Sequence, residues 1–181
     1  MSRIGRLPIP LPDKVTLSEK KKLLTVKGPR GEMTLQIPPG IRVKTEDGLA
    51  IVSTKDESKE IKMLHGTTRA HLANRIQGVS TGHTRILIVQ GKGFQAEIKG
   101  RILEMQLGFS HKVLFEIPVG LVLEIKPGQN SFTLTISGND KQLVGAFSSE
   151  LYKVKKVEPY NLIGFRYSDQ HVKRKAAKTI T

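Results

Sequence analysis

Hydrophobic residues follow two different periods along this chain, and the two periods alternate twice. Runs in which every second residue is apolar are typical of half-buried strands, whereas apolar residues three or four positions apart are typical of an amphipathic helix. Four alternating runs precede a helical pattern in the first half, and six precede one in the second half. Strands are expected at residues 23–27, 32–38, 41–46, 49–54, 85–90, 94–100, 101–108, 113–118, 121–126 and 131–137.

The first helix is expected over residues 56–79. Side chains at helical spacing share one face, which we expect to be buried against the preceding strands. This stripe consists of Ile61, Leu64, Thr68, Leu72, Ile76 and Val79.

The second helix has signals at both ends. Ser137, Asn139 and Asp140 offer side-chain oxygens that accept hydrogen bonds from the unpaired N–H groups of a helix start, so the helix is expected to begin near Lys141. Pro159 is expected to end it, because proline lacks the N–H and disfavours helical geometry in the residue before it. Residues 163–167 then alternate like a further strand. The buried face of this helix would consist of Leu143, Val144, Phe147, Leu151 and Val154.

Short motifs recur between the two halves. VKG at 26–28 recurs as IKG at 98–100, and IP at 37–38 recurs at 117–118. The offset grows from 72 to 80 residues between these matches, which places an eight-residue insertion near residues 108–112. Ordered repeats of this kind indicate an internal duplication.

The duplication predicts the fold class and the domains. We expect an α+β fold of two similar domains, each an antiparallel sheet packed with one helix. The boundary is placed after Gly82, so that the N-terminal domain spans residues 1–82 and the C-terminal domain spans residues 83–181.

The composition favours a polyanionic partner. The chain has 30 Lys and Arg against 16 Asp and Glu, a formal charge of +14, and a basic surface attracts phosphate. In the second half, the excess lies in residues 151–181, with eight basic and two acidic side chains. The absence of cysteine excludes disulfides and cysteine-ligated zinc. No apolar run has the length of a signal peptide or a membrane span, so we expect a soluble intracellular protein.

The first 14 residues form a proline-rich arm. Pro8, Pro10 and Pro12 stand at alternate positions and favour an extended path, and Arg3 and Arg6 lie on the same arm. Two interpretations are open: a solvated tail, or a tail that becomes ordered on RNA.

Few residues have the spacing that enzyme or metal chemistry requires. The five histidines include no i, i+4 pair of the kind that binds metal on a helix. Gly91-Lys92-Gly93 lacks the spacing and ending of a Walker loop, and we interpret it as a turn that lets the backbone approach a partner closely. No cofactor is predicted.

Two places are candidate anion sites. Lys141 and Gln142 stand at the start of the second helix, where N–H groups and a lysine could hold a phosphate in addition to forming an ordinary cap. Ser110, His111 and Lys112 lie in the inserted segment, which could be a binding loop or a solvated turn.

The C-terminal segment adds aromatic and basic side chains. Its aromatic residues could stack on bases or face the core, and strand alternation favours the core. They are Tyr160, Phe165 and Tyr167. The tail has no apolar periodicity, so we expect it to be mobile alone and ordered by a polyanion. Its basic residues are Lys173, Arg174, Lys175 and Lys178.

Several segments resemble the ribosomal protein L6 family of the large subunit, and the likeness runs over essentially the whole chain. SRIGRLPIP resembles the family's N-terminal signature, and GTTRAHLANRIQGVSTG resembles its first helix. GFSHKV resembles its Gly-Tyr-Ser-His-Pro-Val loop, and GNDKQLVGAF resembles its second-helix entry. EPYNLIGFRY falls where the family has Pro-Glu-Pro-Tyr-Lys-Gly-Lys-Gly followed by Arg-Tyr.

This resemblance implies a structural ribonucleoprotein component and no enzyme. The protein would bind large-subunit rRNA mainly through its second domain, near the stalk base and the sarcin–ricin loop, as a monomer beside neighbouring ribosomal proteins and in support of translation. It implies no membrane, cofactor or small-molecule substrate, and a cytoplasmic or plastid ribosome. The rRNA-binding candidates are Lys92, Ser110, His111, Lys112, Lys141, Gln142, Tyr160, Arg166, Lys173, Arg174, Lys175 and Lys178.

The chain departs from the family pattern at three places. Val157 precedes Glu158, where the family usually has proline. Asn161, Leu162 and Ile163 stand where the family has lysine, glycine and lysine, which removes two charges and one flexible position. Lys112 stands in place of the usual proline and could restore one charge.

Two other functions are open from the sequence. One is a free RNA chaperone or regulator with the same fold. The other is a metal-dependent nuclease that uses Asp140 and Glu150, although ten residues on one helix place these side chains on different turns.

Overall fold

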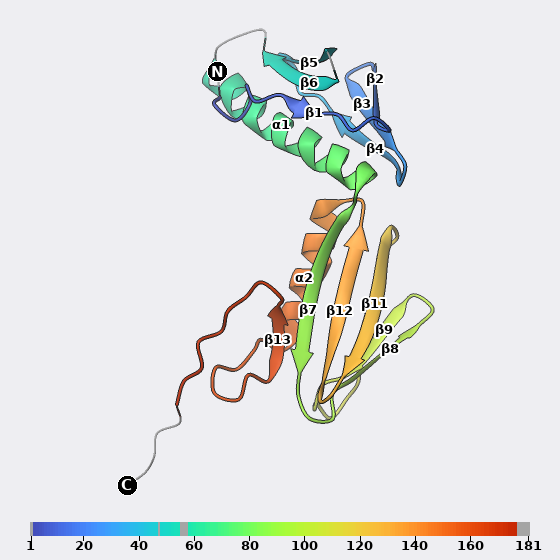
Figure 1. Ribbon diagram of the computed structural model, residues 1–181, viewed down its shortest axis with the longest axis vertical. Coiled ribbons are helices and arrows are strands. Elements are labelled where there is room, and N and C mark those ends of the chain that lie inside the picture. The colour runs from blue at the N-terminus through green and yellow to red at the C-terminus, as the bar shows by residue number, and fades with distance from the viewer. Residues whose placement is uncertain (1, 47, 55–57, 177–181) are drawn as a thin grey trace. The chain divides into compact units, whose positions relative to one another are not determined.

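The chain folds into two compact α+β units in a computed structural model that describes residues 2–46, 48–54 and 58–176 (Figure 1). Unit 1 consists of Met1–His83 with Asn139–Lys141, and unit 2 consists of Thr84–Gly138 with Gln142–Thr181. The α+β class with antiparallel sheets is confirmed, although each unit has two sheets where one was expected. The division of the chain after Gly82 stays a prediction.

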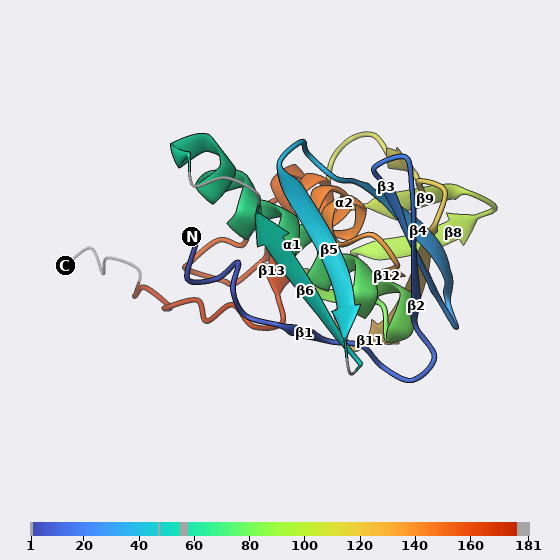
Figure 2. The same ribbon diagram turned by 90° about the horizontal axis from the view of Figure 1, so that it is seen from above.

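Unit 1 contains two three-stranded sheets and one helix. The strand orders are β1-β6-β5 and β2-β3-β4, and α1 packs against β3, β4 and β6 (Figure 2). Leu24, Val26 and Leu72 lie in the shared core. The elements are β1 (Ile9–Pro10), β2 (Thr16–Lys20), β3 (Leu23–Gly28), β4 (Gly31–Gln36), β5 (Ile41–Glu46), β6 (Leu49–Thr54) and α1 (Lys59–Ser80).

Unit 2 contains a three-stranded sheet, a four-stranded sheet and the second helix. The strand orders are β10-β9-β8 and β11-β12-β7-β13. Leu103, Met105, Leu134 and Phe165 are fully buried with the inner face of the helix. The elements are β7 (His83–Gln90), β8 (Gln95–Lys99), β9 (Ile102–Gln106), β10 (Val113–Glu116), β11 (Leu121–Gly128), β12 (Ser131–Gly138), α2 (Lys141–Val154) and β13 (Gly164–Tyr167).

Helix α1 confirms only part of its predicted stripe. Its N-cap is Ser58, whose hydroxyl accepts a hydrogen bond from the Ile61 N–H at 3.4 Å; the expected start at residue 56 lies outside the described residues. Thr68 and the later stripe positions are buried, but Leu64 is 37% exposed. His65 is buried instead, and its Nε2 lies 2.9 Å from the Val52 carbonyl oxygen on β6.

Helix α2 begins at Lys141 as predicted but ends for a different reason than expected. It stops at Val154, well before Pro159. The chain then pairs with β13: the Phe165 N–H donates to the Lys155 carbonyl at 2.8 Å, and the Val157 N–H donates to the Phe165 carbonyl at 3.2 Å. The competing strand partner therefore ends the helix, and proline is not the cause.

The N-terminal arm is neither a solvated tail nor an arm that needs RNA to order it. Ile9 pairs with Ala50 and is buried in the core of unit 1. The Arg69 Nε donates a hydrogen bond to the Leu7 carbonyl at 3.2 Å, and the Leu11 N–H donates to the Gly48 carbonyl at 2.9 Å. The arm thus supplies the first strand of a sheet.

The two units repeat each other, with the predicted match of Ile37 to Ile117 confirmed and the predicted match of residues 26–28 to 98–100 out of register. The Ile37 N–H donates to the Lys22 carbonyl at 2.8 Å, and the Ile117 N–H donates to the Arg101 carbonyl at 2.7 Å. These equivalent bonds align β2-β3-β4 with β8-β9-β10, at offsets of 79 residues before the β3–β4 turn and 80 after it. The expected eight-residue insertion is therefore wrong, since the net difference is one residue.

Gly164 is the position at which β13 depends most on the absence of a side chain. Its φ is +128°, and a Cβ there would lie 2.7 Å from the Lys155 and Lys156 carbonyl oxygens. Gly120, at φ +90°, has open space around it. We expect Gly164→Ala to lower the free energy of unfolding by about 2–4 kcal/mol, through backbone strain plus a clash that backbone atoms cannot relieve.

Gly120→Ala is the matched control for this change, because it adds the strain alone. We expect it to lower the free energy of unfolding by about 1–2 kcal/mol in the same urea titration. Equal losses in the two variants would contradict the account of how β13 is held.

Candidate nucleic-acid interface

Lys155 joins three segments of unit 2 that are far apart in sequence. Its ammonium nitrogen donates to the Leu107 carbonyl at 2.8 Å. It also lies 4.7 Å from the ring centroid of Phe94, after the β7–β8 turn, and 5.0 Å from that of Phe109, in the β9–β10 loop. A cation between two aromatic faces is attracted to both ring quadrupoles. The segment after α2 therefore holds both turns in place.

The β9–β10 loop carries three of the predicted binding residues. The ring of His111 stacks on Phe109, with centroids 5.9 Å apart and an interplanar angle of 14°. Ser110 and His111 are exposed. Because Phe109 also contacts Lys155, the position of His111 depends on Lys155, a residue whose role the sequence pattern did not reveal.

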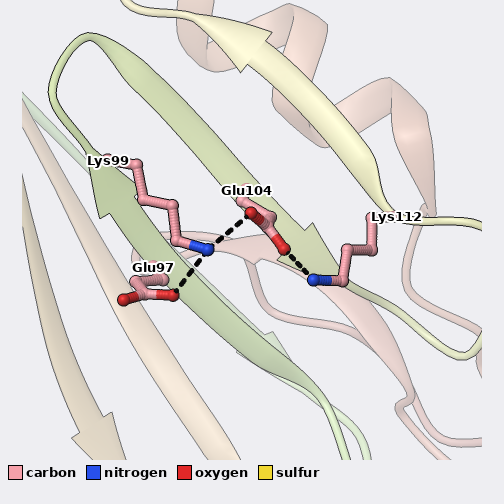
Figure 3. A network of polar contacts seen from close by, with 4 residues as sticks. All are labelled: Glu97, Lys99, Glu104 and Lys112. Carbon is pink, nitrogen blue, oxygen red and sulfur yellow. Dashed lines mark hydrogen bonds and ion pairs between the residues drawn. The ribbon is translucent and has the colours of Figure 1, made fainter.

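Lys92 lies in the β7–β8 turn, and Lys112 lies in the β9–β10 loop. Of the two, only Lys112 has an ion-pair partner in the described part of unit 2. Lys92 is exposed in the β7–β8 turn. Lys112 forms an ion pair with Glu104 on β9 (Figure 3). The predicted extra charge at Lys112 is therefore already partly neutralised by the protein.

Glu104 is the centre of a four-residue charge network. Lys99 lies 2.9 Å from Glu104 and 3.3 Å from Glu97. Hydrogen bonds from Lys112 and then Lys99 lower the pKa of the Glu104 carboxyl below its usual value of 4.5. Hydrogen bonds to Glu104 and then Glu97 raise the pKa of the Lys99 ammonium above 10.5. The Glu104 carboxylate and the Lys99 ammonium therefore each favour the charged form of the other.

The start of α2 holds the next pair of candidates. The Lys141 ammonium donates to the Asn74 side-chain oxygen at 3.1 Å, and by its contacts Lys141 belongs to unit 1. Gln142 is exposed and belongs to unit 2.

The basic tail is more ordered than its sequence indicated. The Arg174 Nε donates to the Tyr160 carbonyl at 3.1 Å, and the Lys175 N–H donates to the Pro159 carbonyl at 3.0 Å. Tyr160 is 44% exposed, and Lys173 is exposed as well. The tail up to residue 176 thus folds back onto the turn at residues 158–161, while Lys178 lies outside the described residues.

Strand β13 separates its side chains between the core and the opposite face. Phe165 is fully buried, and Tyr167 stacks on Tyr152 with centroids 5.1 Å apart, so both face inward as strand alternation predicted. Arg166 pairs with Ile88 in the ladder, and its Nε is buried with no hydrogen-bond partner among the described residues. Such a donor has unused capacity for a partner.

The altered turn after Tyr160 keeps the backbone that glycine would favour. Leu162 has φ +59°, in the left-handed region. Its N–H donates to the Glu158 carbonyl at 2.9 Å, and the Glu158 N–H donates to the Ile163 carbonyl at 2.9 Å. The turn is therefore closed by hydrogen bonds, although the two lysines expected from the resemblance are absent.

The described residues contain neither a metal-binding cluster nor a membrane-spanning helix. No three His, Asp or Glu side chains in that part of the chain gather closely enough to hold a metal ion. Neither α1 nor any other described helix combines the length and apolarity needed to cross a bilayer.

Comparison with known proteins assigns the family. Residues 11–82 and 90–168 match the family model described as Ribosomal protein L6. This chain belongs to the ribosomal protein L6 family. The two matched segments each contain one of the repeated strand–helix copies.

L6-family relatives match the chain from end to end. The large ribosomal subunit protein uL6 of Thermosynechococcus vestitus is 41% identical, with 99% of this chain and 98% of that protein covered. The uL6 proteins of Oleidesulfovibrio alaskensis and Acaryochloris marina are 40% and 38% identical, with at least 98% of each chain covered.

Lys155→Met tests whether the cation holds the β9–β10 loop. We expect amide exchange at residues 108–112 to become about tenfold faster, because the variant loses the hydrogen bond to Leu107 and both aromatic contacts. Hydrogen exchange followed by NMR measures this effect. Lys153→Met, an exposed change on α2, is the control, and equal exchange in both variants would contradict the role of Lys155.

The charge network makes a prediction about pH. Because the pKa of Glu104 is lowered by folding, its contribution to stability is present above 4.5 and is lost as the pH falls through the folded value. We expect Lys112→Met to raise the pKa of Glu104 toward 4.5 in an NMR titration. Lys126→Met should leave it unchanged, and an unchanged Glu104 pKa in Lys112→Met would refute the pairing.

Proposed function

We propose that this protein is a structural constituent of the large ribosomal subunit and binds large-subunit rRNA mainly through unit 2. The observation that carries the proposal is the ordered β9–β10 loop, which Lys155 holds beside the turn bearing Lys92. The names of the relatives support the same subunit. The protein acts by positioning RNA, and its own residues perform no chemical step.

The candidate residues suit phosphate and ribose more than base edges. Lysine is a compact charge that neutralises phosphate, and Ser110 and His111 offer hydrogen bonds from a fixed loop. Contacts of this kind set the register of a protein on RNA without reading its sequence. We therefore expect recognition of the shape of folded rRNA, with contact to 2′-hydroxyl groups.

The C-terminal addition supplies a second group of contacts within unit 2. Arg174 and Lys175 are anchored on the turn beside Tyr160, so less chain entropy is lost when RNA binds there. Arg166 is half-buried on β13 and remains a candidate through its less buried atoms. Lys141 and Gln142 remain candidates at the start of α2.

The finer placement is also a proposal. We infer a position near the stalk base and the sarcin–ricin loop, beside neighbouring ribosomal proteins and with one copy per ribosome. The ribosome would be that of a bacterial cytoplasm or a plastid, which agrees with two cyanobacterial species among the relatives.

Lys92→Ala combined with Lys112→Ala tests the binding surface. We expect weaker binding to purified large-subunit rRNA and a smaller dependence of log K on log salt, because each lost phosphate contact removes about 0.7–0.9 from the slope. Filter binding across a salt series measures both. Lys126→Ala combined with Lys153→Ala removes the same charge from unit 2 and should leave the slope unchanged; equal losses in both pairs would refute the assignment.

Sedimentation separates the structural role from that of a free RNA chaperone. A ribosomal constituent is expected to co-sediment with large subunits in high-salt gradients of cell lysate. Recovery of the protein only at the top of the gradient would refute the structural role.

A further inference from the structure

The tip of the β2–β3 hairpin has an unusual backbone for its residues. Lys21 and Lys22 form its two-residue turn, with φ values of +48° and +67°. Two-residue hairpin turns with positive φ favour Asn-Gly, because a larger side chain is strained in the left-handed region. Two consecutive lysines at these positions therefore reduce the stability of the hairpin.

The chain contains the same hairpin in a less strained form. In unit 2, the equivalent β8–β9 turn has Gly100 at φ +63° in the place of Lys21, followed by Arg101. The equivalence rests on the matching bonds from Ile37 to Lys22 and from Ile117 to Arg101. One copy therefore has glycine at the strained position, whereas the other keeps a lysine.

The charges of the two hairpins also differ. In unit 2, Lys99 forms ion pairs with Glu97 and Glu104. In unit 1, Lys20, Lys21 and Lys22 are all exposed, and none has an ion pair with a residue that the structure describes. Three adjacent positive charges repel one another, and an anion brought between them would remove that repulsion.

The surface beside the turn fits a sugar–phosphate backbone. Lys21 and Lys22 line a groove together with Gln36, Pro38 and Pro39. Apolar proline surface can pack against ribose while the ammonium groups contact phosphates. An acidic protein surface would use the charges but would not need such a groove.

We propose that this hairpin tip is a second RNA-binding site, located in unit 1, where Lys20, Lys21 and Lys22 neutralise backbone phosphates. The proposal rests on the proposed function only in taking the RNA to be large-subunit rRNA. It accounts for the lysines at positions where stability alone favours glycine or asparagine, since strained positions concentrate at functional sites.

Lys21→Asn combined with Lys22→Gly tests the site in the full-length protein. Relief of strain should raise the Tm of unit 1 by about 4 °C or more. Loss of two phosphate contacts should lower the affinity for large-subunit rRNA and reduce the salt slope by about 1.4–1.8. A higher Tm with unchanged affinity and slope would overturn the proposal.

The control removes equal charge from elsewhere in unit 1. Lys44→Gln combined with Lys62→Gln changes two exposed residues on β5 and α1 and should leave the slope at its original value. An equal fall in slope for both pairs would overturn the proposal. The same assay distinguishes this proposal from the unit 2 assignment. If Lys92→Ala with Lys112→Ala binds rRNA normally while the hairpin variant does not, the unit 2 assignment fails and this one stands.

A photo-cross-linking residue at position 21, in large subunits assembled with the full chain, identifies the partner. Cross-links to rRNA would support the proposal. Cross-links to ribosomal proteins alone, or none, would overturn it.

Discussion

The structure of unit 2 depends on the backbone hydrogen bonds between β13 and the segment that follows α2. The bonds from Phe165 to Lys155 and from Val157 to Phe165 end the helix and fix β13 against β7. They also set the position from which Lys155 reaches Phe94, Phe109 and the Leu107 carbonyl. Unit 1 has no counterpart of β13 among its described elements. This arrangement therefore belongs to the segment after α2, which only unit 2 has.

This arrangement links fold to function through rigidity. A loop that meets RNA loses less entropy on binding when its own protein already holds it. In the proposed interface, Lys155 contributes without touching the partner, whereas the exposed side chains of the loop make the contacts. Glu104 has the opposite effect on Lys112, since its carboxylate competes with phosphate for the same ammonium group.

Much of the fold could be predicted because strands and helix starts depend on local sequence patterns. All eleven expected strands are present, and the cap residues placed the start of α2 at Lys141. Strand β2 escaped prediction because its residues are mostly polar and exposed, and β1 because it is two residues long and contains Pro10. One of the two motif matches was out of register, because VKG and IKG look alike but do not occupy equivalent places, whereas Ile37 and Ile117 make equivalent backbone hydrogen bonds.

The site was harder to predict because it depends on long-range contacts. The sequence indicated the loop and tail residues through their position and charge as well as through family resemblance, and their role stays a prediction. It could not indicate Lys155, whose partners lie about 50 residues away in sequence, or the pairing of Lys112 with Glu104. Both contacts depend on how segments that are distant in sequence come together, and a local sequence pattern does not predict this.

The central claim is that the loop held by Lys155 lies against rRNA. A photo-cross-linking residue at position 111, in large subunits purified after assembly, tests it most directly. The account predicts cross-links to large-subunit rRNA, with a lower yield when Lys155 is replaced by methionine. Subunits that contain the protein but give no RNA cross-link from position 111 would contradict it.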